Sequence, residues 1–131
     1  MHSVPWKLSY DTLCDVLESA KHTYPNEFIS LLSVSDKNPF LISEFVVVPS
    51  SFGRDHSVLR SDLIPFDPFI VGSVHSHPSS SMVPSRADKV SFSRLGKIHL
   101  ILGFPYSVGD FRSYDEKGFP VRLEVVYPRN D

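Results

Sequence analysis

A chain of 131 residues, of which 41% are hydrophobic and 21% charged, has the size and composition of one compact globular domain spanning residues 1–131. Its formal net charge is −2, from 13 basic and 15 acidic residues, and no basic run is present, so nucleic acid is not an expected partner. Apolar stretches such as residues 45–48 are far too short to cross a bilayer, so no membrane partner is expected either.

The N-terminal residues and the cysteine content narrow the expectations further. Residues 1–6 lack the charged start and apolar run of a signal peptide, which favours a cytoplasmic location. The only cysteine is Cys14, so neither an internal disulfide nor a cysteine-rich zinc finger is expected. We interpret Cys14 as a buried, small apolar side chain of a helix. Any metal must therefore be bound by histidine and carboxylate.

Apolar periodicity and breaking residues predict two helices and six strands. In chain order these are helix 9–23, strands 27–34, 40–48 and 69–75, helix 85–95, and strands 97–104, 110–114 and 121–127. The last two strands are expected to form a hairpin. Residues 49–68 have no clear period and predict a long surface loop with some edge-strand character, a kind of segment that is often functional. The pattern indicates an α+β domain with a curved mixed sheet flanked by helices.

The strongest motif is His75-Ser76-His77-Pro78, followed by Ser85 and Asp88. Alternate residues of an extended chain point to one face, so both imidazoles project together from the end of the strand. The following loop returns to a helix whose first turn contains Asp88. Two histidines and one carboxylate form a three-ligand set, and catalytic zinc commonly leaves its fourth position to water. The structural alternative is that Ser85 and Asp88 only form a helix capping box.

These residues resemble the JAMM motif of the JAB/MPN metalloprotease family. The family also has an upstream glutamate after a proline and before a short apolar strand, and Glu27 matches that place. The resemblance spans about residues 10–104. It implies a JAB/MPN fold, which is cytidine-deaminase-like. One departure is Ser30, where glycine is common. The alternatives for Glu27 are an exposed surface acid, or Glu44 as the functional carboxylate.

The resemblance also implies a reaction. One zinc ion per chain, held by His75, His77 and Asp88 with a bound water, would hydrolyse peptide or isopeptide bonds after the C-terminal tail of ubiquitin-like modifiers. Glu27 would accept and return the proton of the water, and Ser85 would stabilise the oxyanion. In its short length the chain resembles the stand-alone prokaryotic members of the family, particularly archaeal desampylases, which act on small sampylation-type modifiers. Residues 49–68 would flank the site and add pairing to an extended substrate tail.

Other functions and ligands stay open at this stage. A non-catalytic MPN-type scaffold is one alternative, although such members typically have eroded metal ligands and all of them are present here. A JAB-domain enzyme that processes a sulfur-carrier protein is another, with similar ligands but another substrate. A nucleoside deaminase is excluded because its Pro-Cys-x-x-Cys segment needs more cysteines. The oligomeric state is open, a homodimer included. The remaining histidines are read as terminal (His2), helix-ending (His22), loop (His56) and a satisfied core residue (His99).

Overall fold

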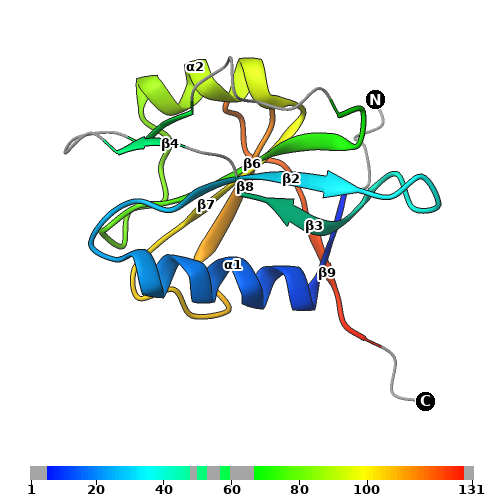
Figure 1. Cartoon of the computed structure of the whole chain (residues 1–131), viewed down its shortest axis with the longest axis horizontal. Coiled ribbons are helices and arrows are strands. Elements are labelled where there is room, and N and C mark those ends of the chain that lie inside the picture. Colours follow the sequence, from blue (N-terminus) through cyan, green and yellow to red (C-terminus); the bar gives the residue numbers. More distant parts are fainter. Residues whose placement is uncertain (1–5, 48–49, 53–56, 60–66, 129–131) are drawn as a thin grey trace.

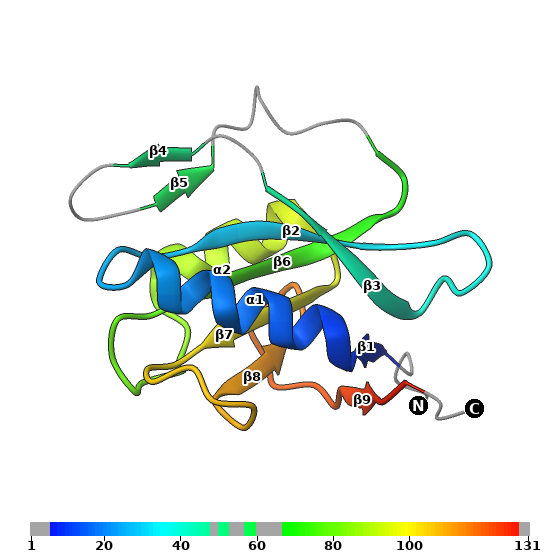
Figure 2. The same cartoon turned by 60° about the horizontal axis from the view of Figure 1, so that its bottom comes forward.

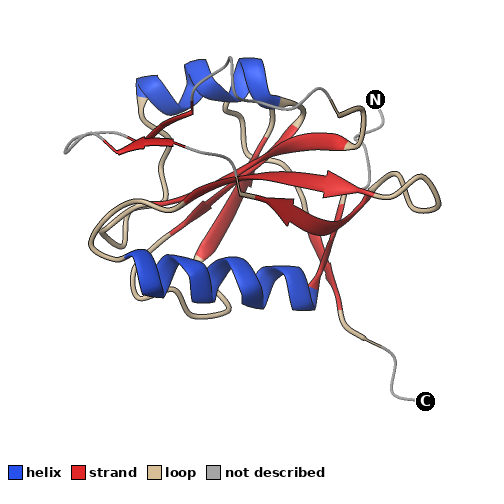
Figure 3. Cartoon of the chain, viewed as in Figure 1, coloured by secondary structure: helices blue, strands red, loops and turns tan. Residues whose placement is uncertain are grey.

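The computed structural model describes residues 6–47, 50–52, 57–59 and 67–128. A seven-stranded mixed sheet crosses the domain, and its helices, α1 (Tyr10–Thr23) and α2 (Arg86–Leu95), lie on opposite faces of it (Figure 1 and Figure 3). Its strands are β1 (Lys7–Ser9), β2 (Ile29–Val34), β3 (Leu41–Val46), β6 (Ile70–Ser76), β7 (Ile98–Leu102), β8 (Phe111–Tyr114) and β9 (Glu124–Val126). Their order in the sheet is β8-β7-β6-β2-β3-β1-β9. The predicted α+β class with a curved mixed sheet is confirmed.

Helix α1 covers one face of the sheet because its apolar residues follow the helical repeat. Leu13, Val16, Leu17 and Ala20 are all buried and form one stripe on the helix. The Ser9 hydroxyl caps the N-terminus by accepting a hydrogen bond from the Thr12 N–H, 3.3 Å away. The stripe packs on the largest apolar cluster, whose buried strand residues include Leu8, Leu32, Ile42, Val74, Leu100 and Leu102.

The central strands place the ends of β2, β6 and β7 together. β2 runs antiparallel to β6, with Ile29 opposite His75, and β7 runs parallel to β6, with Ile101 opposite His75. Gly72 lets β7 approach closely, because a Cβ built there would lie 1.5 Å from the Ile98 carbonyl oxygen. The loops that follow β6 and β7, and the one that precedes β2, therefore meet at one end of the sheet.

The predicted hairpin of residues 110–114 and 121–127 is correct only next to its turn. There the antiparallel bridge of Tyr114 with Pro120 and two hydrogen bonds between Ser113 and Val121 join the two segments. Farther along, the prediction is wrong, because β8 pairs with β7 and β9 pairs in parallel with β1 at the other end of the sheet. The short strand β1 was not predicted.

The region 49–68 contains a small hairpin. β4 (Ser50–Phe52) and β5 (Ser57–Leu59) form a separate antiparallel two-stranded sheet. In both views this hairpin lies at the same end of the molecule as the N-terminal end of α2 (Figure 1 and Figure 2). The rest of that segment is outside the described residues. Neither helix in the described part of the chain has the length and apolar character that a membrane span requires.

Candidate metal centre

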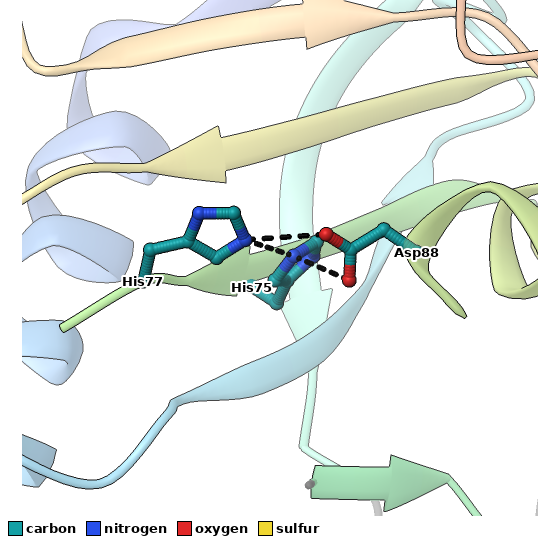
Figure 4. Close-up of side chains that lie close together, drawn as sticks. All are labelled: His75, His77 and Asp88. Carbon is teal, nitrogen blue, oxygen red and sulfur yellow. Dashed lines mark hydrogen bonds and ion pairs between the residues drawn. The ribbon is translucent and has the colours of Figure 1, made fainter. Parts of the chain in front are cut away.

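Three side chains converge at the end of β6. His75 is in β6, His77 follows it by two residues, and Asp88 lies in the first turn of α2 (Figure 4). The His75 Nε2 and His77 Nε2 atoms are 3.1 Å apart. His75 Nε2 is 3.2 Å from Asp88 Oδ1, and His77 Nε2 is 3.2 Å from Asp88 Oδ2. The structure thus brings together the three residues that the motif singled out as ligands.

These distances fit a metal ion. Ligand atoms bound at about 2.0–2.1 Å with tetrahedral angles are about 3.3 Å from one another. The three observed separations are 3.1, 3.2 and 3.2 Å. Among the described residues, His75, His77 and Asp88 form a group whose ligand atoms all lie within 4.8 Å of one another. Two imidazoles and one carboxylate are a donor set that zinc accepts.

The His77 ring is oriented by a backbone group. Its Nδ1 lies 2.9 Å from the Ser81 carbonyl oxygen, which can only accept, so Nδ1 carries a proton and donates it. In the neutral ring, Nε2 is then free of a proton and offers its lone pair toward the centre of the group. In the protonated ring, Nε2 instead donates to Asp88 Oδ2 at 3.2 Å. The pKa of His77 is raised by the hydrogen bond with Asp88, although burial acts in the opposite direction.

Asp88 makes the capping box and faces the histidines at the same time. Its N–H donates to Ser85 Oγ at 3.0 Å, and its Oδ2 accepts from the Ser85 N–H at 2.8 Å. Burial disfavours the charged carboxylate, but hydrogen bonds from His75 and His77 outweigh burial and hold its pKa well below the ordinary value. Asp88 is therefore ionised at neutral pH, as a metal ligand must be.

Glu27 is placed beside this group by the strand register. Ile29 is opposite His75, and Phe28 is joined to Ser76 by two hydrogen bonds. Glu27 and His77 are the next residues outward from this pair, just beyond the ends of β2 and β6. The side chain is half-buried. Its negative charge contributes to the raised pKa of His77, which indicates electrostatic proximity.

Ser85 is exposed at the N-terminus of α2, and its oxygen accepts the Asp88 N–H. Among the described residues, no hydrogen bond uses its hydroxyl as a donor, so this proton can be offered to a bound ligand. Ser85 can therefore cap α2 and donate a hydrogen bond to a ligand at the same time.

Glu44, the alternative carboxylate, and Ser30, at the position where glycine is common in the family, are not part of the candidate metal centre. Glu44 is exposed in β3 opposite Ser33, four residues along β2 from the residue that faces His75. Ser30 is fully buried, and its hydroxyl donates to the Val46 carbonyl oxygen at 2.7 Å. The serine therefore ties β2 to the end of β3 without entering the site.

The other residues discussed from the sequence, His99, His22 and Cys14, are not part of the candidate metal centre. His99 is fully buried, stacked on Phe92 at 4.4 Å between ring centroids, and hydrogen-bonded at both ring nitrogens, as the core interpretation predicted. His22 is exposed in the last turn of α1 and lies 3.3 Å from Glu18. Cys14 is half-buried rather than buried, because it lies at the border of the buried stripe of α1. His2 and His56 are outside the described residues.

Sequence reasoning missed one residue that contacts the site. The Tyr106 hydroxyl donates to the His77 carbonyl oxygen at 2.7 Å. Tyr106 is 29 residues from His77 and follows β7, so only the parallel pairing of β6 with β7 brings the two together. No local pattern in the sequence signals this contact.

Comparison with known proteins agrees with the geometry. A family model for prokaryotic homologs of the JAB domain matches residues 11–116. A curated relative from Haloferax volcanii, called a probable metalloprotease, is 32% identical over 127 residues, which cover 91% of this chain and 78% of the relative.

Two solved structures have the same fold. One, presented as JAMM, a metalloprotease-like zinc site in the proteasome and signalosome, is 36% identical with a TM-score of 0.74, covering 94% of this chain and 99% of that one. A JAB1/MPN domain protein from Archaeoglobus fulgidus is 34% identical with a TM-score of 0.72, covering 95% and 99%. The chain therefore has the JAB/MPN fold and belongs to the prokaryotic JAB family, some of whose structural relatives carry a metalloprotease-like zinc site.

Proposed function

We propose that this protein is a zinc-dependent isopeptidase or peptidase that cleaves after the C-terminal tail of a ubiquitin-like modifier protein. The observation that carries the metal-dependent part is the convergence of His75, His77 and Asp88 at separations of 3.1–3.2 Å. The relative called a probable metalloprotease supports the reaction class. The modifier as substrate is supported by the resemblance of the motif to the JAMM family.

His75, His77 and Asp88 would hold one zinc ion per chain, with a water molecule as fourth ligand. When bound, zinc lowers the pKa of such a water to about 7 and polarises a carbonyl. The protein residues supply the rest. The Glu27 carboxylate takes up a proton from the attacking water and gives it to the departing amine as the C–N bond breaks.

Ser85 would assist at the carbonyl oxygen. Its hydroxyl donates a hydrogen bond to the oxygen that becomes negatively charged when water adds to the carbonyl carbon. Because the Ser85 oxygen is already held by the Asp88 N–H, the hydroxyl needs little reorganisation to act. A covalent intermediate is not required, so neither Cys14 nor another serine needs to be a nucleophile.

The β4–β5 hairpin is our candidate for tail binding. In the described part of the chain, each of its strands pairs only with the other, so each has an edge to which an extended tail could add. A tail bound in this way would be extended and its peptide groups aligned, which is how the scissile bond would be presented to the metal centre.

The test is hydrolysis of defined conjugates. The zinc-loaded protein is incubated with a ubiquitin-like modifier joined through its C-terminal glycine to a lysine side chain or to a peptide, with and without a chelator. We expect cleavage at the modifier terminus that the chelator abolishes and zinc restores. Tight zinc binding without cleavage of any conjugate would refute the isopeptidase function and leave a non-catalytic modifier-binding scaffold.

A further inference from the structure

Tyr106 is buried to 1% exposure in a loop after β7, yet its phenol reaches back to the strand that carries the histidines. Its hydroxyl donates to the His77 carbonyl oxygen at 2.7 Å. The His77 N–H donates to the Leu102 carbonyl oxygen at 2.8 Å. Both backbone polar groups of His77 are therefore held from β7 and the segment after it.

Ser76, between the two histidines, holds the other side of the site. It is fully buried; its Oγ accepts the Phe28 N–H at 2.8 Å, and its own N–H donates to the Phe28 carbonyl oxygen at 2.9 Å. The residue next to Glu27 is therefore fastened to the residue next to His77 on both of its backbone polar groups. These two hydrogen bonds fix Ser76 and Phe28 relative to each other.

The two anchors act on adjacent residues, because Tyr106 holds the His77 carbonyl oxygen and Phe28 holds Ser76. Tyr106 also has a φ of +67°, a left-handed conformation that a bulky residue rarely adopts and that persists where the surroundings hold it in place. The backbone is thus bent in the way that aims this phenol at residues 76 and 77.

We propose that Tyr106 and Ser76 are positioning residues that fix His77 and Glu27 relative to each other across β6 and β2. This inference rests on the proposed function for its catalytic part, since it treats His77 as a metal ligand and Glu27 as the proton acceptor. Tyr106 touches neither the metal nor the substrate. It sets the place from which the His77 imidazole extends, while Ser76 sets the place of Phe28, the residue next to Glu27.

The protein contains a matched control for this contact. Tyr114, 8% exposed, donates its hydroxyl to the Met82 carbonyl oxygen at 2.6 Å. Tyr106→Phe and Tyr114→Phe each remove one phenol-to-carbonyl hydrogen bond from a buried ring. The two variants should therefore lose similar stability, while only the first removes a hydrogen bond to a candidate metal ligand itself.

The experiment compares these variants in the full chain. Outer contacts to metal ligands typically contribute about tenfold to hundredfold in metal affinity or activity. For Tyr106→Phe we expect zinc affinity, measured by competition with a chromogenic chelator, to fall by about tenfold, and kcat on a modifier conjugate to fall at least as much with little change in KM. Tyr114→Phe should change each value less than about twofold.

Ser76→Ala should behave like Tyr106→Phe, and the double variant should lose less than the product of the two single losses, because both act on the same stretch of backbone, residues 76–77. Equal zinc affinities and equal kcat values for Tyr106→Phe and Tyr114→Phe would overturn the inference. The zinc measurement needs no substrate. A wild-type protein that binds zinc but cleaves nothing would refute the isopeptidase function alone, and the comparison of zinc affinities would still decide the role of Tyr106.

Discussion

The Asp88 carboxylate caps helix α2 and contacts the two histidines. The sequence left open whether Ser85 and Asp88 form a helix cap or a site, and the structure shows the cap bonds and the histidine contacts together. The cap also fixes the carboxylate, since Oδ2 is held by the Ser85 N–H. A ligand oriented in this way needs no further ordering when a metal binds.

Glu27 is tested by removing its charge while its size is kept. In Glu27→Gln we expect zinc binding to persist and kcat to fall by about 10²–10⁴-fold, because an amide cannot accept the proton of the attacking water. Zinc content by elemental analysis and turnover of a modifier conjugate are measured on the same sample. Turnover close to that of the wild type would show that another residue is the base.

His77 is tested through metal-linked stability. At a free zinc concentration of about 100 times the dissociation constant, binding stabilises the folded state by about 2.7 kcal/mol. We expect zinc to raise the thermal midpoint of the wild type but not that of His77→Ala, which lacks one ligand. His22→Ala is the control, since His22 is exposed, pairs with Glu18 and is not part of the group. An equal zinc-induced shift in His77→Ala would remove His77 from the ligand set.

His99 should make stability depend on pH. Burial lowers its pKa to about 4 from an ordinary 6.5, so between these values the unfolded chain binds more protons than the folded one. Its contribution is complete above pH 6.5 and is lost as the pH falls toward 4, by about 3 kcal/mol in total.

The measurement is the free energy of unfolding in urea from pH 7 to pH 4, with chelator present so that zinc release does not contribute. His99→Gln cannot titrate, so we expect its curve to be flatter than that of the wild type over this range. Parallel curves for the two proteins would show that His99 is not the group responsible.

At the scale of elements, local patterns predicted both helices and the central strands, and long-range pairing decided the rest. Leu13, Val16, Leu17 and Ala20 repeat at helical spacing, so the sequence carries α1 by itself. β1 has three residues, too few to show a period, and it pairs with β9 across 117 positions of sequence. The candidate ligands were found because they lie close in sequence, whereas Tyr106 was not.

The β4–β5 hairpin permits a test of tail binding. We expect that replacing residues 50–59 by a short Gly-Ser linker raises KM for a modifier conjugate by about tenfold or more, because the lost strand pairing no longer orders the tail. A short chromogenic peptide that lacks the tail is the control substrate. Unchanged KM for the conjugate would show that the hairpin does not bind it.

At the scale of the whole molecule, β9 and the segment before it cover part of the main apolar cluster. Val121, Leu123 and Val125 pack against the main apolar cluster from β9 and the segment before it. A chain that ends at Phe119 should lose several kcal/mol, at about 1–2 kcal/mol for each partly buried side chain. This is a large part of the stability of a small domain.

Urea denaturation followed by circular dichroism measures that loss. A chain that ends at Pro128 keeps β9 and serves as the control, so we expect its midpoint to match that of the full chain. An unchanged midpoint for the chain ending at Phe119 would show that β9 is dispensable for folding.

The parallel pairing of β1 with β9 has a practical consequence. These strands are the third and fourth positions beyond β6 on the side of β2, so both leave the sheet away from the strand that carries the histidines. An affinity tag, a fluorophore or a linkage to a solid support attached next to either strand would therefore be separated from the candidate metal ligands by strands β2 and β3.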